Sequence, residues 1–177
     1  MGKYILKKPD LSYSEQIVNY RNEFLQCDSS MDGTGRLRSI DDPEKWILDN
    51  LLMEKEDTCP MGLSLAFQYI YVDEDDNLVG MIQLRPKAMS HPYLRQYGGH
   101  IGYSVLPSRR RQGIGKKMLK DFLPICKSEY NLDRVMISCL KDNEASRRII
   151  VGNGGVFEKE VYYAPEEKEL QRYWIEL

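Results

Sequence analysis

The sequence predicts a single-domain α/β fold, in which a mixed β-sheet of about six or seven strands is flanked by helices. The chain has 177 residues, 42% of them hydrophobic, which is enough for one continuous core. An antiparallel hairpin pattern in its first half is followed by alternating strand and helix patterns. The two patterns together favour one mixed sheet over an all-helical or all-β fold.

Two helices are expected before the hairpin. Ser12-Tyr13-Ser14-Glu15 has the form of a capping box, and apolar residues follow it at helical spacing. Asp42-Pro43 supplies an N-cap with proline in the first turn of a second helix. The expected elements are a strand at 3–7, a helix at 13–27, a loop at 28–40 and a helix at 42–56.

The remainder of the chain carries most of the strands. Aromatic and β-branched residues surround the polar turn 73–77, which predicts a hairpin. After Pro107 the periodicity changes repeatedly between helical and extended. The expected elements are strands at 65–72, 78–84, 100–106, 134–140, 156–162 and 173–177, and helices at 113–130 and 143–151.

Composition excludes several classes of protein. The 25 basic and 27 acidic side chains give a net charge of −2, so we expect no nucleic-acid partner. The four cysteines include no C-x-x-C pair, and His91 and His100 complete no zinc spacing, so we expect no metal. No signal peptide and no apolar run of about 18 residues is present, which predicts a cytoplasmic protein without membrane contact.

A glycine-rich turn lies where the strand at 100–106 passes into the helix at 113–130. Gly113 and Gly115 leave the backbone bare, so an anionic group can approach the amides at the positive end of the helix dipole. The three arginines 109–111 add positive charge, and a guanidinium can pair with phosphate through two hydrogen bonds. The turn is therefore a candidate pyrophosphate site, although a solvated charge run followed by an ordinary turn is the alternative.

The segment 100–157 resembles the core of the GNAT acetyltransferase superfamily. The hallmark of that family, Arg/Gln-x-x-Gly-x-Gly/Ala, is similar to Arg110-Arg111-Gln112-Gly113-Ile114-Gly115, which also follows a strand and opens a helix. The stretch from Asn143 to Ile150 resembles the second motif of the family, and residues 153–157 resemble its exit into the next strand. The resemblance implies one acetyltransferase domain over residues 1–177 with a cofactor-binding core at 100–157.

The resemblance further implies acetyl-CoA as the acyl donor, bound where the family's sheet splays open. The pyrophosphate would lie on the amides of 112–116, and the pantetheine arm along the backbone of 103–106. Asn143 and Ser146 would lie beside this arm, although Asn143 could instead be only an N-cap. The expected cofactor-binding residues are Tyr103, Val105, Leu106, Arg110, Arg111, Gln112, Gly113, Ile114, Gly115, Lys116, Asn143 and Ser146.

The chemistry implied is direct attack of an amine on the thioester, which needs a base, an oxyanion site and an acid. His100 is the first choice for the base, because strand alternation places it at the mouth of the splayed sheet and its ordinary pKa is near neutrality. The amide near Val105 is the candidate oxyanion site. Many family members carry a tyrosine where this chain has Ile150. The possible replacements as the acid are Tyr162, Tyr163, Tyr103 or solvent.

Acidic residues near the loop after the first helix are candidates for binding the acceptor. Glu23, Asp28 and Asp32 would attract a cationic amine or serve as alternative bases, while ordinary solvated charge is the other interpretation for each. A homodimer is also possible, with the strand at Tyr173-Trp174 supplying an edge.

The function expected is acetyl-CoA-dependent N-acetylation of a primary amine of a small molecule or peptide. A catalytically silent acyl-CoA sensor is the alternative, motivated by Ile150 at the usual tyrosine position. A nucleotide-binding, kinase-like protein is disfavoured, because no Walker lysine follows Gly115.

Overall fold

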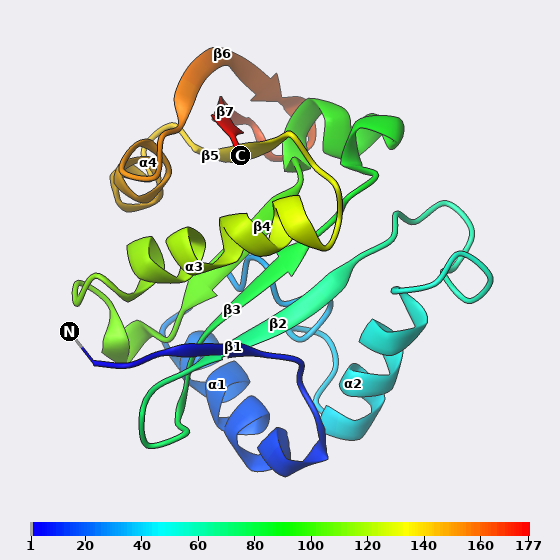
Figure 1. Cartoon of the computed structure of the whole chain (residues 1–177), viewed down its shortest axis with the longest axis vertical. Helices are drawn as coiled ribbons and strands as arrows, with labels where there is room; N and C mark the ends of the chain where they lie inside the picture. Colours follow the sequence, from blue (N-terminus) through cyan, green and yellow to red (C-terminus); the bar gives the residue numbers. More distant parts are fainter. Residues whose placement is uncertain (1) are drawn as a thin grey trace.

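The computed structural model describes residues 2–177. Within them, seven strands form a four-stranded sheet in the order β1-β2-β3-β4 and a three-stranded sheet in the order β5-β7-β6 (Figure 1). The strands are β1 (Ile5–Lys7), β2 (Phe67–Val72), β3 (Leu78–Leu84), β4 (Ile101–Val105), β5 (Arg134–Leu140), β6 (Val156–Tyr163) and β7 (Lys168–Glu176). The α-helices are α1 (Ser14–Gln26), α2 (Pro43–Leu52), α3 (Ile114–Ser128) and α4 (Glu144–Val151). The α/β class with flanking helices is confirmed.

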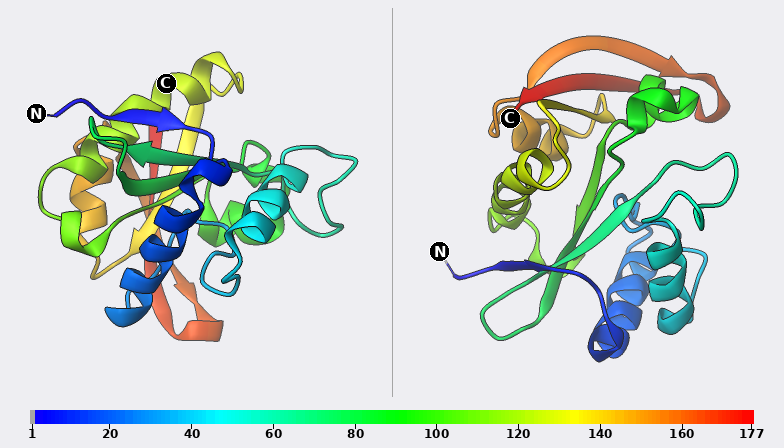
Figure 2. Two further views of the ribbon diagram at one scale, coloured as in Figure 1. Left: turned by 90° about the horizontal axis from the view of Figure 1, so that it is seen from below. Right: turned by 45° about the vertical axis from the view of Figure 1, so that its right-hand side comes forward.

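Helices cover both faces of the four-stranded sheet, and each face has its own core. On one face, α3 buries Phe122 among residues that include Ile82 and Ile137. On the other face, α1 and α2 bury Ile17 and Trp46 against residues that include Met81. Figure 2 shows α1 and α2 on the side of the sheet opposite to α3, with β6 and β7 set apart beyond α3 and α4.

Strand β7 lies in the middle of the second sheet, between β5 and β6. Tyr173 is opposite Ile137 of β5 on one side and Phe157 of β6 on the other. The expectation that Tyr173-Trp174 offers a free edge to a second copy is therefore wrong, because both edges of β7 are paired. Within residues 2–177, the edge strands of this sheet are β5 and β6.

The start of α1 differs from the predicted capping box. Asp10, not Ser12, accepts the capping hydrogen bond, from the Ser12 amide at 2.8 Å, and a 3-10 turn at Leu11–Tyr13 precedes α1. The cap of α2 is as predicted, because the Asp42 carboxylate accepts from the amides of Glu44 and Lys45. The expected ends of the strands at 78–84 and 134–140 are those observed.

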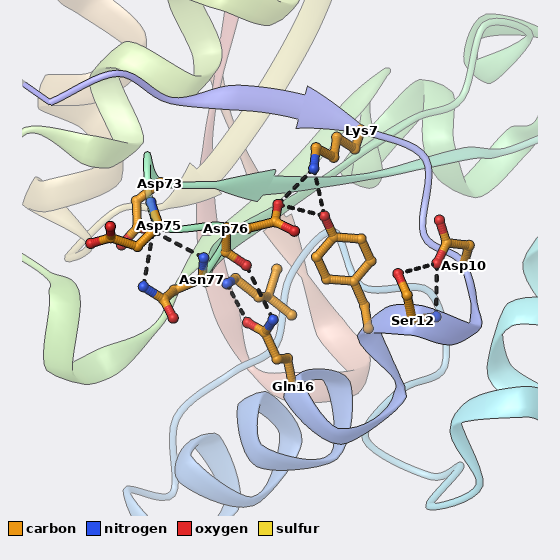
Figure 3. A network of polar contacts seen from close by, with 10 residues as sticks. Lys7, Asp10, Ser12, Gln16, Asp73, Asp75, Asp76 and Asn77 are labelled. Atoms are coloured by element: carbon orange, nitrogen blue, oxygen red, sulfur yellow. Dashed lines mark hydrogen bonds and ion pairs between the residues drawn. The ribbon is translucent and has the colours of Figure 1, made fainter.

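A polar network fastens the start of α1 to the turn between β2 and β3 (Figure 3). Lys7 Nζ and the Tyr13 hydroxyl both donate to Asp76 Oδ1, each at 2.6 Å. The Gln16 side chain accepts from the Leu78 amide at 2.6 Å and donates to the Asp76 carbonyl at 3.1 Å. The network therefore holds α1 in place on the sheet.

The two sheets meet at His100, just before β4. The His100 amide donates to the Met136 carbonyl at 2.7 Å, and the Met136 amide donates to His100 Nδ1 at 2.9 Å. Beyond this pair, β4 continues in one sheet and β5 in the other. The division places the open edge of β4 beside the start of α3.

Candidate active site

The glycine-rich turn presents backbone amides at the start of α3. Arg111 and Gly113 both have left-handed backbone conformations, with φ values of 62° and 79°. Glycine adopts this conformation without strain, which explains Gly113. The amide of Lys117 donates to the Gly113 carbonyl at 3.1 Å and closes the first helical turn. The amides ahead of it have no acceptor within the helix, so they point outward at the positive end of the dipole. This geometry suits a phosphate group.

Gly115 is required by packing between elements. A Cβ at Gly115 would lie 2.8 Å from Ile149 Cδ1 on α4 and 3.4 Å from Val105 Cγ2 on β4. Asn153 adds a polar tie, because its side-chain amide donates to the carbonyls of Lys116 and Ile149. Gly113 is thus favoured by its backbone conformation, and Gly115 by the lack of space for a side chain.

The cations around the turn divide into bound and available ones. Arg109 pairs with Asp73 at 2.7 Å. Arg110 donates to the Val105 carbonyl at 3.1 Å and to Ser29 Oγ at 2.8 Å, so its guanidinium braces the turn rather than facing a cofactor. Arg111 and Lys116 are exposed, and within residues 2–177 neither has a carboxylate within 4.0 Å. These two side chains are free to bind phosphate.

The edge of β4 that faces β5 has available backbone groups. The Leu106 amide donates to the Val79 carbonyl at 2.9 Å, and the Arg85 amide donates to the His100 carbonyl at 2.7 Å. Because backbone groups alternate along a strand, those of Tyr103 and Val105 point away from β3. The backbone groups of Tyr103 and the amide of Val105 can pair with an extended ligand. The Val105 carbonyl already accepts from Arg110, and the Leu106 amide, also expected to pair with the ligand, is bound within its own sheet.

Tyr103 and Ser146 meet between β4 and α4. The Tyr103 hydroxyl is 2.8 Å from Ser146 Oγ, and burial raises the pKa of Tyr103, so the phenol is protonated at neutral pH. Asn143 caps α4, because its side-chain oxygen accepts from the Ser146 amide at 3.0 Å. Ile150 is fully buried. Tyr103 is thus a phenol on β4 that reaches the helix containing Ile150, the position discussed above for its missing tyrosine.

His100 does not lie open at a mouth, as expected for the base. It is 4% exposed, and its Nδ1 already accepts from Met136. Burial, followed by the charge of Arg85, lowers the pKa of His100 from 6.5 to about 4. The imidazole is therefore neutral and used as a structural acceptor, and the geometry does not favour it as the base.

Tyr162 and Tyr163 lie at the far end of β6. Tyr162 is 58% exposed, while the ring of Tyr163 packs 4.8 Å from that of Tyr97 in the β3–β4 connection. In register they oppose Glu169 and Lys168, beyond Leu170, which opposes the last residue of β5. Within residues 2–177, neither tyrosine has a hydrogen bond or ring contact with Tyr103 or Ser146.

The three acidic candidates have different surroundings. Glu23 accepts from the Ser108 amide at 2.6 Å and from its hydroxyl at 3.1 Å, so it fixes the turn before α3 and does not face an acceptor. The Asp28 side chain is 96% exposed, with a long ion pair to Arg38. Asp32 is exposed and precedes Gly33, where a Cβ would lie 2.1 Å from the Gly102 carbonyl oxygen of β4. Only Asp32 is thus held beside β4.

Arg85 was not anticipated from the sequence. It follows β3, and its guanidinium lies against Gly102, on the same stretch of β4 that Gly33 contacts. The only indication in the sequence was one charged residue at the end of an apolar strand, and such a residue is equally typical of a strand that simply ends in solvent.

A hollow of about 120 Å³ borders the turn and is lined by Gln112, Gly113, Ile114 and Lys117 together with Gly2 and Tyr4. A larger one of about 440 Å³ lies between residues 56–65 and 87–92 and contains none of the predicted site residues.

Residues 2–177 contain no membrane-spanning helix and no cluster of metal-binding side chains. No helix in this range combines the length and hydropathy that crossing a bilayer requires. The same range brings together no three His, Cys, Asp or Glu side chains in a metal-binding group.

Comparison with known families agrees with this geometry. Residues 10–156 match the model of a family described as acetyltransferase (GNAT) domain. The chain therefore belongs to the GNAT family of N-acetyltransferases, as the motifs predicted.

Solved structures with the same fold are distant in sequence. The ribosomal-protein-S5-alanine acetyltransferase of Vibrio fischeri is 19% identical, with 99% of this chain and 94% of that chain covered and a TM-score of 0.73. A ribosomal L7/L12 α-N-protein acetyltransferase in complex with coenzyme A is 16% identical, with coverages of 98% and 94% and a TM-score of 0.72. A spermidine N-acetyltransferase of Vibrio cholerae is 13% identical, with coverages of 97% and 94% and a TM-score of 0.64. The comparison with curated proteins gives no match. At these identities the likeness establishes the fold and leaves the acceptor open.

Proposed function

We propose that this chain transfers the acetyl group of acetyl-CoA to a primary amine of a small molecule or peptide by direct attack on the thioester. The observation that carries the proposal is the position of the glycine-rich turn, whose outward amides lie beside the free edge of β4. An extended thiol ester with a pyrophosphate at one end fits these two features together.

The cofactor-binding residues have separate tasks. The amides of 112–116 bind the pyrophosphate, and Arg111 and Lys116 add charge that is not compensated by a neighbouring carboxylate. The backbone of Tyr103 pairs with the pantetheine arm, while the Val105 amide is kept for the oxyanion. Asn143 keeps its side-chain NH2 for the arm, because only its oxygen is used in capping α4.

The transfer needs a consistent path for its protons. An ammonium group attracted by Asp32 loses a proton to a neighbouring water molecule. As the C–N bond forms, the Val105 amide donates to the oxyanion, and the attacking nitrogen then loses its second proton to solvent. As the C–S bond breaks, the Tyr103 hydroxyl donates its proton to the leaving thiolate and recovers one from solvent through Ser146. Tyr103 thereby takes the role of the tyrosine that many family members carry at the position of Ile150.

The same proposal places the protein in the cytoplasm. All four cysteines, Cys27, Cys59, Cys126 and Cys139, are free thiols, as expected in a reducing compartment. Burial raises the pKa of Cys139 to about 11, which makes this thiol a poor nucleophile and supports direct transfer over an acetyl-cysteine intermediate.

The test of cofactor binding is calorimetric titration with acetyl-CoA, for the parent and for Gly113→Glu. A carboxylate at residue 113 would repel the pyrophosphate, so we expect affinity to fall at least about 100-fold, beyond the tenfold of a single weak contact. Gly62→Glu is the matched control, because Gly62 has a φ of 84° with open space around it and lies away from the turn. A parent protein that does not bind acetyl-CoA would refute the proposal.

The alternative of a silent sensor rests on Ile150 and is separated by turnover. Release of free CoA that depends on an added amine supports the enzyme, whereas tight CoA binding without amine-dependent release in a broad screen supports the sensor. Competition between ATP and acetyl-CoA tests the disfavoured nucleotide-binding alternative in the same assay.

A further inference from the structure

Arg85 is a partly buried guanidinium without an acidic partner. Its Nε donates to the Gly99 carbonyl at 3.2 Å and its Nη2 to the Gly98 carbonyl at 3.1 Å. Within residues 2–177, no carboxylate lies within 4.0 Å of it, whereas the buried Arg172 pairs with Glu158 at 2.9 Å. Burial lowers the pKa of Arg85 to about 10, which shows that its surroundings do not fully compensate its charge.

The guanidinium lies beside the stretch of β4 where transfer is proposed. A Cβ at Gly102 would be 3.3 Å from Arg85 Nη2 and 3.0 Å from the Gly33 amide nitrogen. Arg85, the β4 backbone and the loop that carries Asp32 therefore converge immediately before Tyr103. The charge of Asp32 is also close enough to raise the pKa of both Arg85 and Tyr103, as a smaller effect than burial.

We propose that the acceptor is an amine that also carries a carboxylate, bound by Arg85 while Asp32 attracts its ammonium group. The inference deepens the proposed function and rests on it. The internal bonds of Arg85 use Nε and Nη2, which leaves Nη1 to donate to a ligand. A carboxylate here would accept from Nη1 and supply the counter-charge that the chain lacks.

An acceptor with only positive charge fits this corner less well. A polyamine or simple alkylamine would bring a second positive charge toward Arg85, whose charged form is already destabilised by burial. Like charges in a partly desolvated site repel strongly. A zwitterionic amine meets one partner of each sign, Arg85 for its carboxylate and Asp32 for its ammonium.

The experiment uses matched acceptor pairs: each standard primary-amine amino acid and the amine formed by its decarboxylation. Acetyl-CoA turnover is followed by release of free thiol. We expect kcat/KM to be at least about tenfold higher for the carboxylate member of the best pair, and Arg85→Gln to reduce that preference about 10- to 100-fold, the range of charge-assisted hydrogen bonds. Arg85→Lys should retain an intermediate preference, because lysine keeps the positive charge but lacks the planar set of guanidinium donors.

The control is Arg95→Gln, an exposed arginine of the same connection, which should leave the preference unchanged. Arg85→Lys can still donate to the Gly98 and Gly99 carbonyls, so it provides the measurement if Arg85→Gln does not fold. Equal turnover of both members, a preference that survives Arg85→Gln, or a protein that binds acetyl-CoA yet acetylates no carboxylate-bearing amine overturns the inference. Failure to bind acetyl-CoA would instead refute the proposed function.

Discussion

The hydroxyl of Tyr103 illustrates how a single residue can take over a task from another element. Family resemblance directs attention to position 150 on α4, but Ile150 is fully buried there. The contact with Ser146 brings a phenol from β4 to the same helix instead. Its raised pKa keeps the proton available for donation, since the phenol is not ionised near neutral pH.

Tyr103→Phe should therefore lower kcat about 10- to 100-fold, toward the lower end of general acid catalysis, while the affinity for acetyl-CoA changes little. Steady-state kinetics across pH separates proton donation from a packing role. Solvent donates protons less readily at high pH, so loss of the Tyr103 hydroxyl should lower kcat most at high pH. Tyr163→Phe is the matched control, since its ring packs on Tyr97 at the far end of β6. Equal losses in the two variants would count against Tyr103 as the donor.

Packing between α3 and α4 depends on Gly115. The residue is buried, and the nearest neighbour of an added Cβ is Ile149 Cδ1, the end of a flexible side chain. A single methyl group can be accommodated if Ile149 moves. A branched side chain cannot, because Val105 of β4 lies on the other side.

Gly115→Ala should change the free energy of unfolding by less than about 1 kcal/mol, because the tight contact is partly offset by the better helix propensity of alanine. Gly115→Val should destabilise the protein by about 1–3 kcal/mol through overpacking. Denaturant unfolding measures both. In an Ile149→Ala background the cost of Gly115→Val should shrink, and an unchanged cost would show that α4 is not the element that limits this position.

The sequence predicts these elements better than it predicts their partners. Most strand and helix bounds follow from local periodicity, and the Gly113 turn follows from a motif whose geometry is local. The strand expected at 173–177 is instead Lys168–Glu176, and the helix expected at 42–56 is Pro43–Leu52. Glu23 and Arg110 were predicted to face ligands, yet Glu23 binds Ser108 across 85 positions and Arg110 binds Ser29 across 81. Those contacts arise only when α1 packs on the sheet, so neither residue type nor spacing could reveal them.

For the whole molecule, the decisive feature is the place where one sheet becomes two. The family resemblance implied a sheet that splays, but nothing in the sequence indicated that a histidine side chain would replace a backbone acceptor where the two sheets divide. His100 accepts from Met136 through Nδ1, which requires a neutral imidazole. Strands β4 and β5 therefore separate at the contact between His100 and Met136, called here the junction, and this separation leaves the edge of β4 free. Protonation of His100 Nδ1 would break the junction.

This junction should make stability depend on pH in a defined window. The pKa of His100 is lowered from 6.5 to about 4 in the folded protein, so the unfolded chain takes up the proton first as the pH falls. The contribution is fully present above pH 6.5 and is lost progressively toward pH 4, with a maximum of about 3 kcal/mol. His100→Gln keeps an oxygen to accept from Met136 but does not titrate, so its deficit relative to the parent should be largest at pH 7 and should shrink by pH 4. Urea unfolding of both proteins across this range measures the difference. His91→Gln, which removes the other histidine of the chain, should follow the parent; if it abolishes the pH dependence instead, the junction is not the group that titrates.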